Sequence, residues 1–173
     1  MIHTIVVPGG RDQMMAFGRF IIISCLVTNL ENGMRPMDRV VYSENADGSR
    51  GKPYSPQVFP QGIWRVGKPI LVDPAKDPRE YMQPWFIPTD ACQLVDVWEV
   101  EQTDHLRYVA KTGEQVMDFG YGGHFSKCDF TLGCLKVTVE DDLLWLVSEI
   151  RQVQGAGDSV RLAVAANIQE EEA

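Results

Sequence analysis

The segment from residue 122 to residue 137, GGHFSKCDFTLGCLKV, carries one of the three histidines and two of the four cysteines of the chain. A nucleophilic cysteine needs a base that forms the thiolate, access to solvent, and backbone amides directed at the oxyanion of the substrate. We interpret Cys134 as the candidate nucleophile and His124 as its base, with the amides of Gly133 and Cys134 as oxyanion donors. This pattern predicts cysteine-dependent acyl transfer.

The glycines of this region permit sharp turns and close backbone approach around a reactive group. They stand at positions 120, 122, 123 and 133. If FGYGGHFS ends one strand and GCLKV begins its neighbour, the loop between them returns the imidazole to the thiol. Asp118, Asp129 or a backbone carbonyl could then orient the His124 ring, and the sequence does not choose among them.

Three other interpretations of the segment remain open. A zinc site would use His124, Cys128 and Cys134, with Asp129 or water as the fourth ligand, but it lacks the closely spaced cysteine pair of most structural zinc sites. In an oxidising compartment Cys128 and Cys134 could form a disulfide. In the third interpretation, His124 and Cys134 are ordinary structural residues. We favour the catalytic pair and expect no metal.

The elements that must position this segment are mainly predicted strands. Runs rich in β-branched residues lie between turn signals, and alternating residues near the middle of the chain predict a hairpin. The expected strands cover residues 2–7, 19–29, 38–45, 62–67, 93–101, 105–113 and 159–168. Prolines predict irregular loops over residues 48–61 and 68–88, the second with a helical turn near residues 78–85.

One convincing helix follows the Cys134 segment, over residues 138–154 and ending at Gly155. Thr138 and Asp141 fit a reciprocal cap, and acidic residues fill the first turn, close enough for the helix dipole to favour the Cys134 thiolate. The expected buried face consists of Val139, Leu143, Leu146, Val147 and Ile150. The fold class is therefore mainly β, a β-sandwich or an open barrel-like sheet with one principal α-helix after Cys134.

Composition and charge define the class of protein. The chain has 173 residues, 45% of them hydrophobic and 23% charged, which predicts one globular domain over residues 1–168 and an acidic tail over 169–173. A net charge of −8 without a Lys/Arg cluster argues against a nucleic-acid partner. No apolar run is long enough for membrane insertion, and no signal peptide is evident, so we expect synthesis in the cytoplasm.

The residues H…TLGCLKVTVEDDLLWL resemble the C-terminal catalytic signature of L,D-transpeptidases. That signature has an upstream His, then Ser/Thr-x-Gly-Cys, an aliphatic residue, a basic residue and a helix that begins with acidic residues. The matching residues are Thr131, Gly133, Cys134, Leu135 and Lys136. The resemblance covers residues 120–150, with a weaker echo in FPQGIWRVGKP. Leu132 stands where the family usually has His, Lys136 replaces its usual Arg, and the His-to-Cys spacing is shorter, as in a compact, divergent member.

This resemblance implies acyl transfer or hydrolysis on a peptidoglycan stem peptide, without a cofactor. Cys134, activated by His124, would attack the carbonyl that precedes a terminal D-alanine. Lys136 would steer a substrate carboxylate, while Tyr121 and Thr131 would help to bind the peptide. Because peptidoglycan lies outside the cytoplasm, the resemblance also implies periplasmic action after delivery by a phage or a secretion system. The alternative is a non-catalytic binding protein or a phage- or secretion-associated structural protein on the same scaffold. The oligomeric state is left open.

Overall fold

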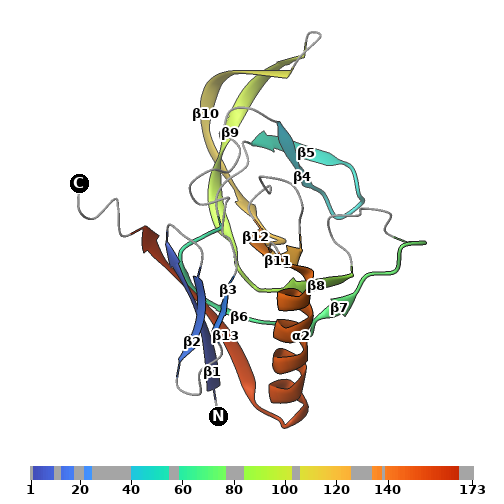
Figure 1. The fold of residues 1–173 in the computed structure, drawn as a ribbon. Helices are drawn as coiled ribbons and strands as arrows, with labels where there is room; N and C mark the ends of the chain where they lie inside the picture. Colours follow the sequence, from blue (N-terminus) through green and yellow to red (C-terminus); the bar gives the residue numbers. More distant parts are fainter. Residues whose placement is uncertain are drawn as a thin grey trace.

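The computed structural model is mainly β, with a described helix directly after the Cys134 segment, as the sequence predicts (Figure 1). It describes residues 2–9, 13–17, 22–24, 40–54, 59–76, 84–102, 106–125, 134–137 and 139–167. The described strands form sheets of five, four and four strands. No helix in this described part of the chain is both long and apolar enough to cross a bilayer. The expected tail over residues 169–173 lies outside these ranges.

The five-stranded sheet unites distant parts of the sequence in the order β3-β2-β1-β13-β6. Its strands are β1 (Ile2–Gly9), β2 (Gln13–Phe17), β3 (Ile22–Ser24), β6 (Gly62–Arg65) and β13 (Ser159–Asn167). Strands β1 and β13 run parallel, whereas the other neighbours are antiparallel. The two strands lie side by side at the centre of this sheet in Figure 1.

The second sheet, here called the hairpin sheet, has the order β10-β9-β5-β4. Its strands are β4 (Val41–Glu44), β5 (Arg50–Tyr54), β9 (Gln93–Gln102) and β10 (Leu106–Asp118). The expected β9–β10 hairpin is confirmed, and it extends away from the helix in Figure 1. Strand β5 falls within residues 48–61, so the expectation of an irregular loop there is wrong for residues 50–54.

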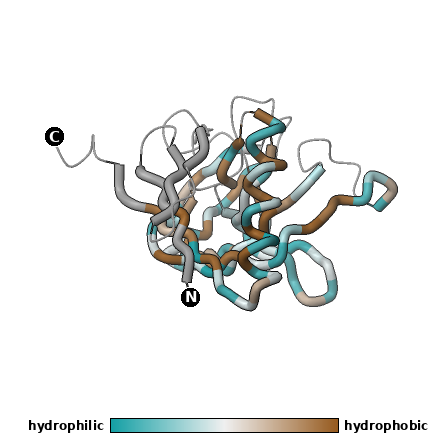
Figure 2. The backbone as a smooth tube through the Cα atoms, turned by 60° about the horizontal axis from the view of Figure 1, so that its bottom comes forward, coloured by the Kyte–Doolittle hydropathy of each residue, from teal (hydrophilic) through white to brown (hydrophobic). Residues whose placement is uncertain are grey.

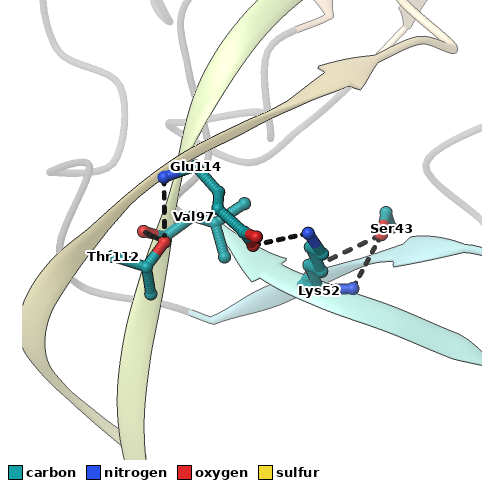
Figure 3. A network of polar contacts seen from close by, with 5 residues as sticks. All are labelled: Ser43, Lys52, Val97, Thr112 and Glu114. Atoms are coloured by element: carbon teal, nitrogen blue, oxygen red, sulfur yellow. Dashed lines mark hydrogen bonds and ion pairs between the residues drawn. The ribbon is translucent and has the colours of Figure 1, made fainter.

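Strand β10 does not stop at Gly113 as its turn-like sequence predicts. The register with β9 shifts between Lys111 and Gln115, and Gly113 adopts a φ of 84° within this irregularity. The Thr112 hydroxyl donates to the Val97 carbonyl at 3.0 Å and accepts from the Glu114 amide at 3.2 Å (Figure 3). A Thr-Gly pair can therefore make a bulge within a strand instead of ending it.

The third sheet, here called the site sheet, has the order β12-β11-β8-β7 and carries the predicted chemistry. Its strands are β7 (Ile70–Leu71), β8 (Trp85–Pro88), β11 (Gly122–Phe125) and β12 (Leu135–Val137). Strands β7 and β8 arise within residues 68–88, so the expectation of irregular loops there is wrong for residues 70–71 and 85–88. Trp85 begins a strand rather than ending a helical turn, and residues 77–83 lie outside the described ranges.

Helix α2 (Glu140–Gly155) covers one face of the site sheet. Its buried side chains are Leu143, Leu146, Val147 and Ile150. Figure 2 shows hydrophobic and hydrophilic residues alternating along the coil of α2, as expected for a helix with one buried stripe. The expected end at Gly155 is confirmed, although the left-handed residue that follows is Gly157, with a φ of 86°.

The predicted start of the helix needs correction. Val139, not Thr138, is the N-cap residue, and it has extended backbone angles and no side-chain cap; Thr138 of the expected capping box lies outside the described residues. The Val139 carbonyl instead accepts from the amides of Asp142 and Leu143 at 3.1 and 3.3 Å. Val139 is also 50% exposed, because its extended backbone takes its side chain out of the helical stripe. The acidic first turn is present as expected.

Candidate active site

The parallel pairing of β11 with β12 brings the histidine strand beside the cysteine segment. Gly123 is the register partner of Leu135, and His124 is the partner of Lys136. Cys134 directly precedes Leu135, the first residue of β12. The expectation that one strand ends in His124 and its neighbour begins near Cys134 is therefore confirmed at the level of the backbone.

The two faces of the site sheet have different roles. Leu135 and Val137 belong to the hydrophobic core beneath α2, and together with Gly123 they line an apolar cavity of about 20 Å³. Because side chains alternate along a strand and register partners share a face, His124 and Lys136 lie on the opposite face. Continuing the alternation of β12 by one residue places Cys134 on that same face.

Close packing holds this face together at Gly122. A Cβ atom at this position would lie 2.4 Å from the Phe86 ring and 2.4 Å from the Ile87 carbonyl oxygen. Only glycine therefore lets β8 lie so near β11. The expectation that the glycines allow close backbone approach is confirmed here, while Gly120, with a φ of 88°, supplies the turn just before β11.

His124 is 3% exposed, and its Nδ1 lies 3.0 Å from the Phe125 carbonyl oxygen. The tautomer that carries its proton on Nδ1 donates to this carbonyl and leaves Nε2 as the basic nitrogen. The centroid of the Phe86 ring lies 6.4 Å from that of the imidazole. Of the three orienting groups that the sequence left open, the backbone carbonyl is thus the one seen next to the ring, and Asp129 lies outside the described residues.

Cys134 forms no disulfide and has an intermediate exposure. Its Sγ lies 3.9 Å from the Gly120 carbonyl oxygen, which accepts a weak hydrogen bond from the thiol. Cys134 therefore does not take part in the alternative disulfide. Within the described ranges no three His, Cys, Asp or Glu side chains gather as metal ligands, but Cys128 and Asp129 lie outside them.

The expected help from the helix dipole needs correction. Helix α2 begins beyond the far end of β12, whereas Cys134 stands before its near end. Three strand residues span about 10 Å, and a dipole acts mainly within the first turn of its helix. Glu140, Asp141 and Asp142 add negative charge at the same helix end. The α2 dipole therefore gives the Cys134 thiolate little support.

Tyr121 is 3% exposed and sits in a network that sequence reasoning missed. Its hydroxyl donates to the Asp118 carboxylate and accepts from Gln93 Nε2 at 2.8 Å. The other Asp118 oxygen accepts from the Tyr54 hydroxyl at 2.7 Å. The Thr89 hydroxyl donates to the Tyr121 carbonyl at 2.6 Å. Only the short spacing of Asp118 and Tyr121 hints at this network, because its other members come from distant strands.

Burial, followed by the hydrogen bond to the Asp118 carboxylate, raises the pKa of Tyr121 and that of Tyr54 above the ordinary value for a phenol. Both groups are therefore neutral hydrogen-bond donors at physiological pH. Tyr121 was expected to line a substrate pocket, but its ring packs edge-on against Phe59, 5.6 Å between centroids, inside the core. Its observed contacts are those of a structural anchor.

The sequence-predicted site residues thus divide into two groups. His124, Cys134, Lys136 and Tyr121 are described, and the first three share one region of the site sheet. Thr131 and Gly133 lie outside the described residues, as does any oxyanion contact from the Gly133 amide.

Comparison of the chain with known protein families, with curated proteins and with solved structures found no match.

Proposed function

We propose that the protein is a cysteine-dependent acyltransferase or hydrolase that acts on peptidoglycan stem peptides in the manner of an L,D-transpeptidase. The observation that carries the proposal is the parallel β11–β12 pair, which places His124 on β11 and Cys134 directly before β12, on the same face by strand alternation. The sequence resemblance supplies the substrate class. Lys136, 5% exposed and beside His124 in the register, would receive the substrate carboxylate.

The chemistry follows from the atoms that this arrangement offers. His124 Nε2 takes the proton of the Cys134 thiol, and the sulfur attacks the carbonyl carbon before the terminal D-alanine. As the tetrahedral intermediate collapses, the imidazolium gives this proton to the departing amine and a thioester remains. A second amine, or water, then loses a proton to His124 and attacks the thioester, which releases the product and restores the thiol.

A carbapenem tests the proposal, because its lactam carbonyl can acylate a cysteine activated in this way. We expect one adduct per chain, located at Cys134 by peptide mass spectrometry. Cys134→Ala should abolish it, and His124→Ala should lower the acylation rate by about 10²-fold or more, since general-base catalysis contributes about that much. Cys92→Ala is the matched control, because Cys92 is another described cysteine outside any disulfide, and it should leave the adduct unchanged.

A non-catalytic binding protein on the same scaffold is the second candidate. The observation that favours it is the near-complete burial of His124 and Lys136, which suits structural residues as well as a closed site. This candidate predicts a folded protein in which the carbapenem leaves Cys134 unmodified. Equal modification of Cys92 and Cys134 would likewise argue against the proposed enzyme, because it would show no special activation.

A further inference from the structure

The connection over residues 119–121 joins the hairpin sheet to the site sheet and is anchored from several strands. Asp118 ends β10, and its carboxylate accepts from Tyr54 on β5 and from Tyr121. Gln93 on β9 donates to the Tyr121 hydroxyl, and Thr89, directly after β8, donates to the Tyr121 carbonyl. Residues of β5, β9 and β10, together with Thr89, thus fix the point at which the chain enters β11.

This anchored connection meets the candidate nucleophile directly. Gly120 lies between Asp118 and Tyr121, and its carbonyl oxygen is the group 3.9 Å from Cys134 Sγ. Strand β11 begins at Gly122, two positions before His124. Any shift of the connection therefore moves the carbonyl that faces the sulfur and the strand that carries the imidazole.

We propose that Asp118 is a positioning residue, which holds the Cys134 thiol and strand β11 in place. The effect of this positioning on acyl transfer rests on the proposed function. A carboxylate is suited to this task because each of its two oxygens accepts from one phenol, whereas an amide in the same place would turn a donating NH2 group toward one of them. Hydrogen bonds to a charged acceptor in a partly buried site are also stronger than neutral ones. Asp118 touches neither the sulfur nor the reacting carbonyl, so it acts through Tyr121 and Gly120.

The test compares Asp118→Asn with Asp96→Asn, the same change at an exposed carboxylate of the hairpin sheet that pairs with Lys111. The first readout is hydrogen–deuterium exchange of the peptide that covers residues 119–125. We expect exchange at least about tenfold faster in Asp118→Asn than in the wild type, and unchanged exchange in Asp96→Asn. Unchanged exchange in both variants overturns the proposal.

The second readout is the rate of carbapenem acylation at Cys134. Misplacement of reacting groups by about 1 Å can cost 10²-fold in rate, so we expect a fall of about 10- to 100-fold in Asp118→Asn. Tyr54→Phe, which removes one phenol and keeps Asp118, should give a smaller fall and covers the case in which Asp118→Asn does not fold. A wild-type acylation rate retained by both folded variants overturns the positioning role.

Failure of the proposed function gives a different result. If the carbapenem does not acylate even the wild type, the enzyme proposal fails, and iodoacetamide alkylation of Cys134 relative to Cys92 replaces the second readout. Positioning by Asp118 still predicts that Asp118→Asn changes this ratio about threefold or more while Asp96→Asn does not. An unchanged ratio overturns it.

Discussion

The hairpin sheet and the site sheet differ in how far their polar and charged side chains are exposed to solvent. The ion pairs Lys52–Glu114, Arg107–Glu101 and Lys111–Asp96 all belong to the hairpin sheet, and their side chains are 42% to 73% exposed. In the site sheet, His124 and Lys136 are 3% and 5% exposed. Exposed pairs contribute little to stability, whereas burial of a polar group is costly. The costly arrangement is found where the sequence predicts chemistry.

The two sheets also differ in what supports them. The site sheet packs on α2 through Leu135 and Val137, which are each 1% exposed. The hairpin sheet buries Val95 and Val97 but leaves apolar side chains such as Leu94, Val109 and Met117 exposed. We therefore expect the stability of the protein to be sensitive to changes behind the site sheet and tolerant of changes on the hairpin.

The largest effect is expected for Leu143→Ala, behind the site sheet. Leu143 is fully buried on α2, so its truncation should lower the free energy of unfolding by about 2–5 kcal/mol. Leu144→Ala is the matched control, because Leu144 is the next residue and is 41% exposed. Urea unfolding followed by circular dichroism measures both changes. Similar losses for the two variants would contradict the comparison.

A smaller effect is expected from alkaline pH, through tyrosines of the hairpin sheet and of its connection to the site sheet. Burial raises the pKa of Tyr108 to about 12, and the pKa values of Tyr54 and Tyr121 are raised as well. Each folded pKa lies above the unfolded value of 10.0, so the stabilisation is complete below that pH and is lost as pH rises toward the folded values. The free energy of unfolding should be measured from about pH 8 to about pH 11, a range that brackets the ordinary phenol pKa of about 10. We expect it to fall at the alkaline end.

Tyrosine ionises with a pKa of about 10, and the phenolate that forms absorbs near 295 nm. This absorbance should rise as the stability falls. In Tyr54→Phe the loss should be weaker, because one of the shifted groups is gone. A free energy of unfolding that stays constant up to about pH 11, which is about one unit above the ordinary phenol pKa, would contradict the assigned burial and hydrogen bonds.

The smallest effect is expected for Glu114→Gln on the hairpin sheet. The Lys52–Glu114 pair is 52% and 60% exposed, so its loss should cost less than about 1 kcal/mol (Figure 3). Thermal unfolding at low and at high salt measures the change, and salt should reduce it further. Thr112→Val is an informative partner variant, since it removes the hydroxyl that satisfies the Glu114 amide and should cost more.

Local patterns predicted what depends on local sequence. Strand alternation indicated β9, and the spacing of Leu143, Leu146 and Ile150 indicated the buried face of α2. The Gly-rich segment indicated that the His124 and Cys134 segments lie on adjacent strands. In each case the residues that decide the structure are neighbours in the sequence.

Features that depend on distant partners were not predictable in this way. The prolines suggested a loop with a helical turn that ends at Trp85, but β8 forms because β11 offers it a partner from residue 122 onward. Gly113 looked like a strand end, but Val97 and Thr112 hold the bulge within β10. The Asp118 network likewise needs Tyr54, 64 positions away, and no local pattern indicates such a contact.

The central pairing of β1 with β13 has a consequence for biosynthesis. Ile2 aligns with Ser159, so β1 leaves the ribosome long before its parallel neighbour exists. Throughout that interval one edge of β1 has unpaired amides and carbonyls, which other nascent chains can bind. We therefore expect translation to be the period in which this protein is most prone to aggregate, and arrival of β13 to end it.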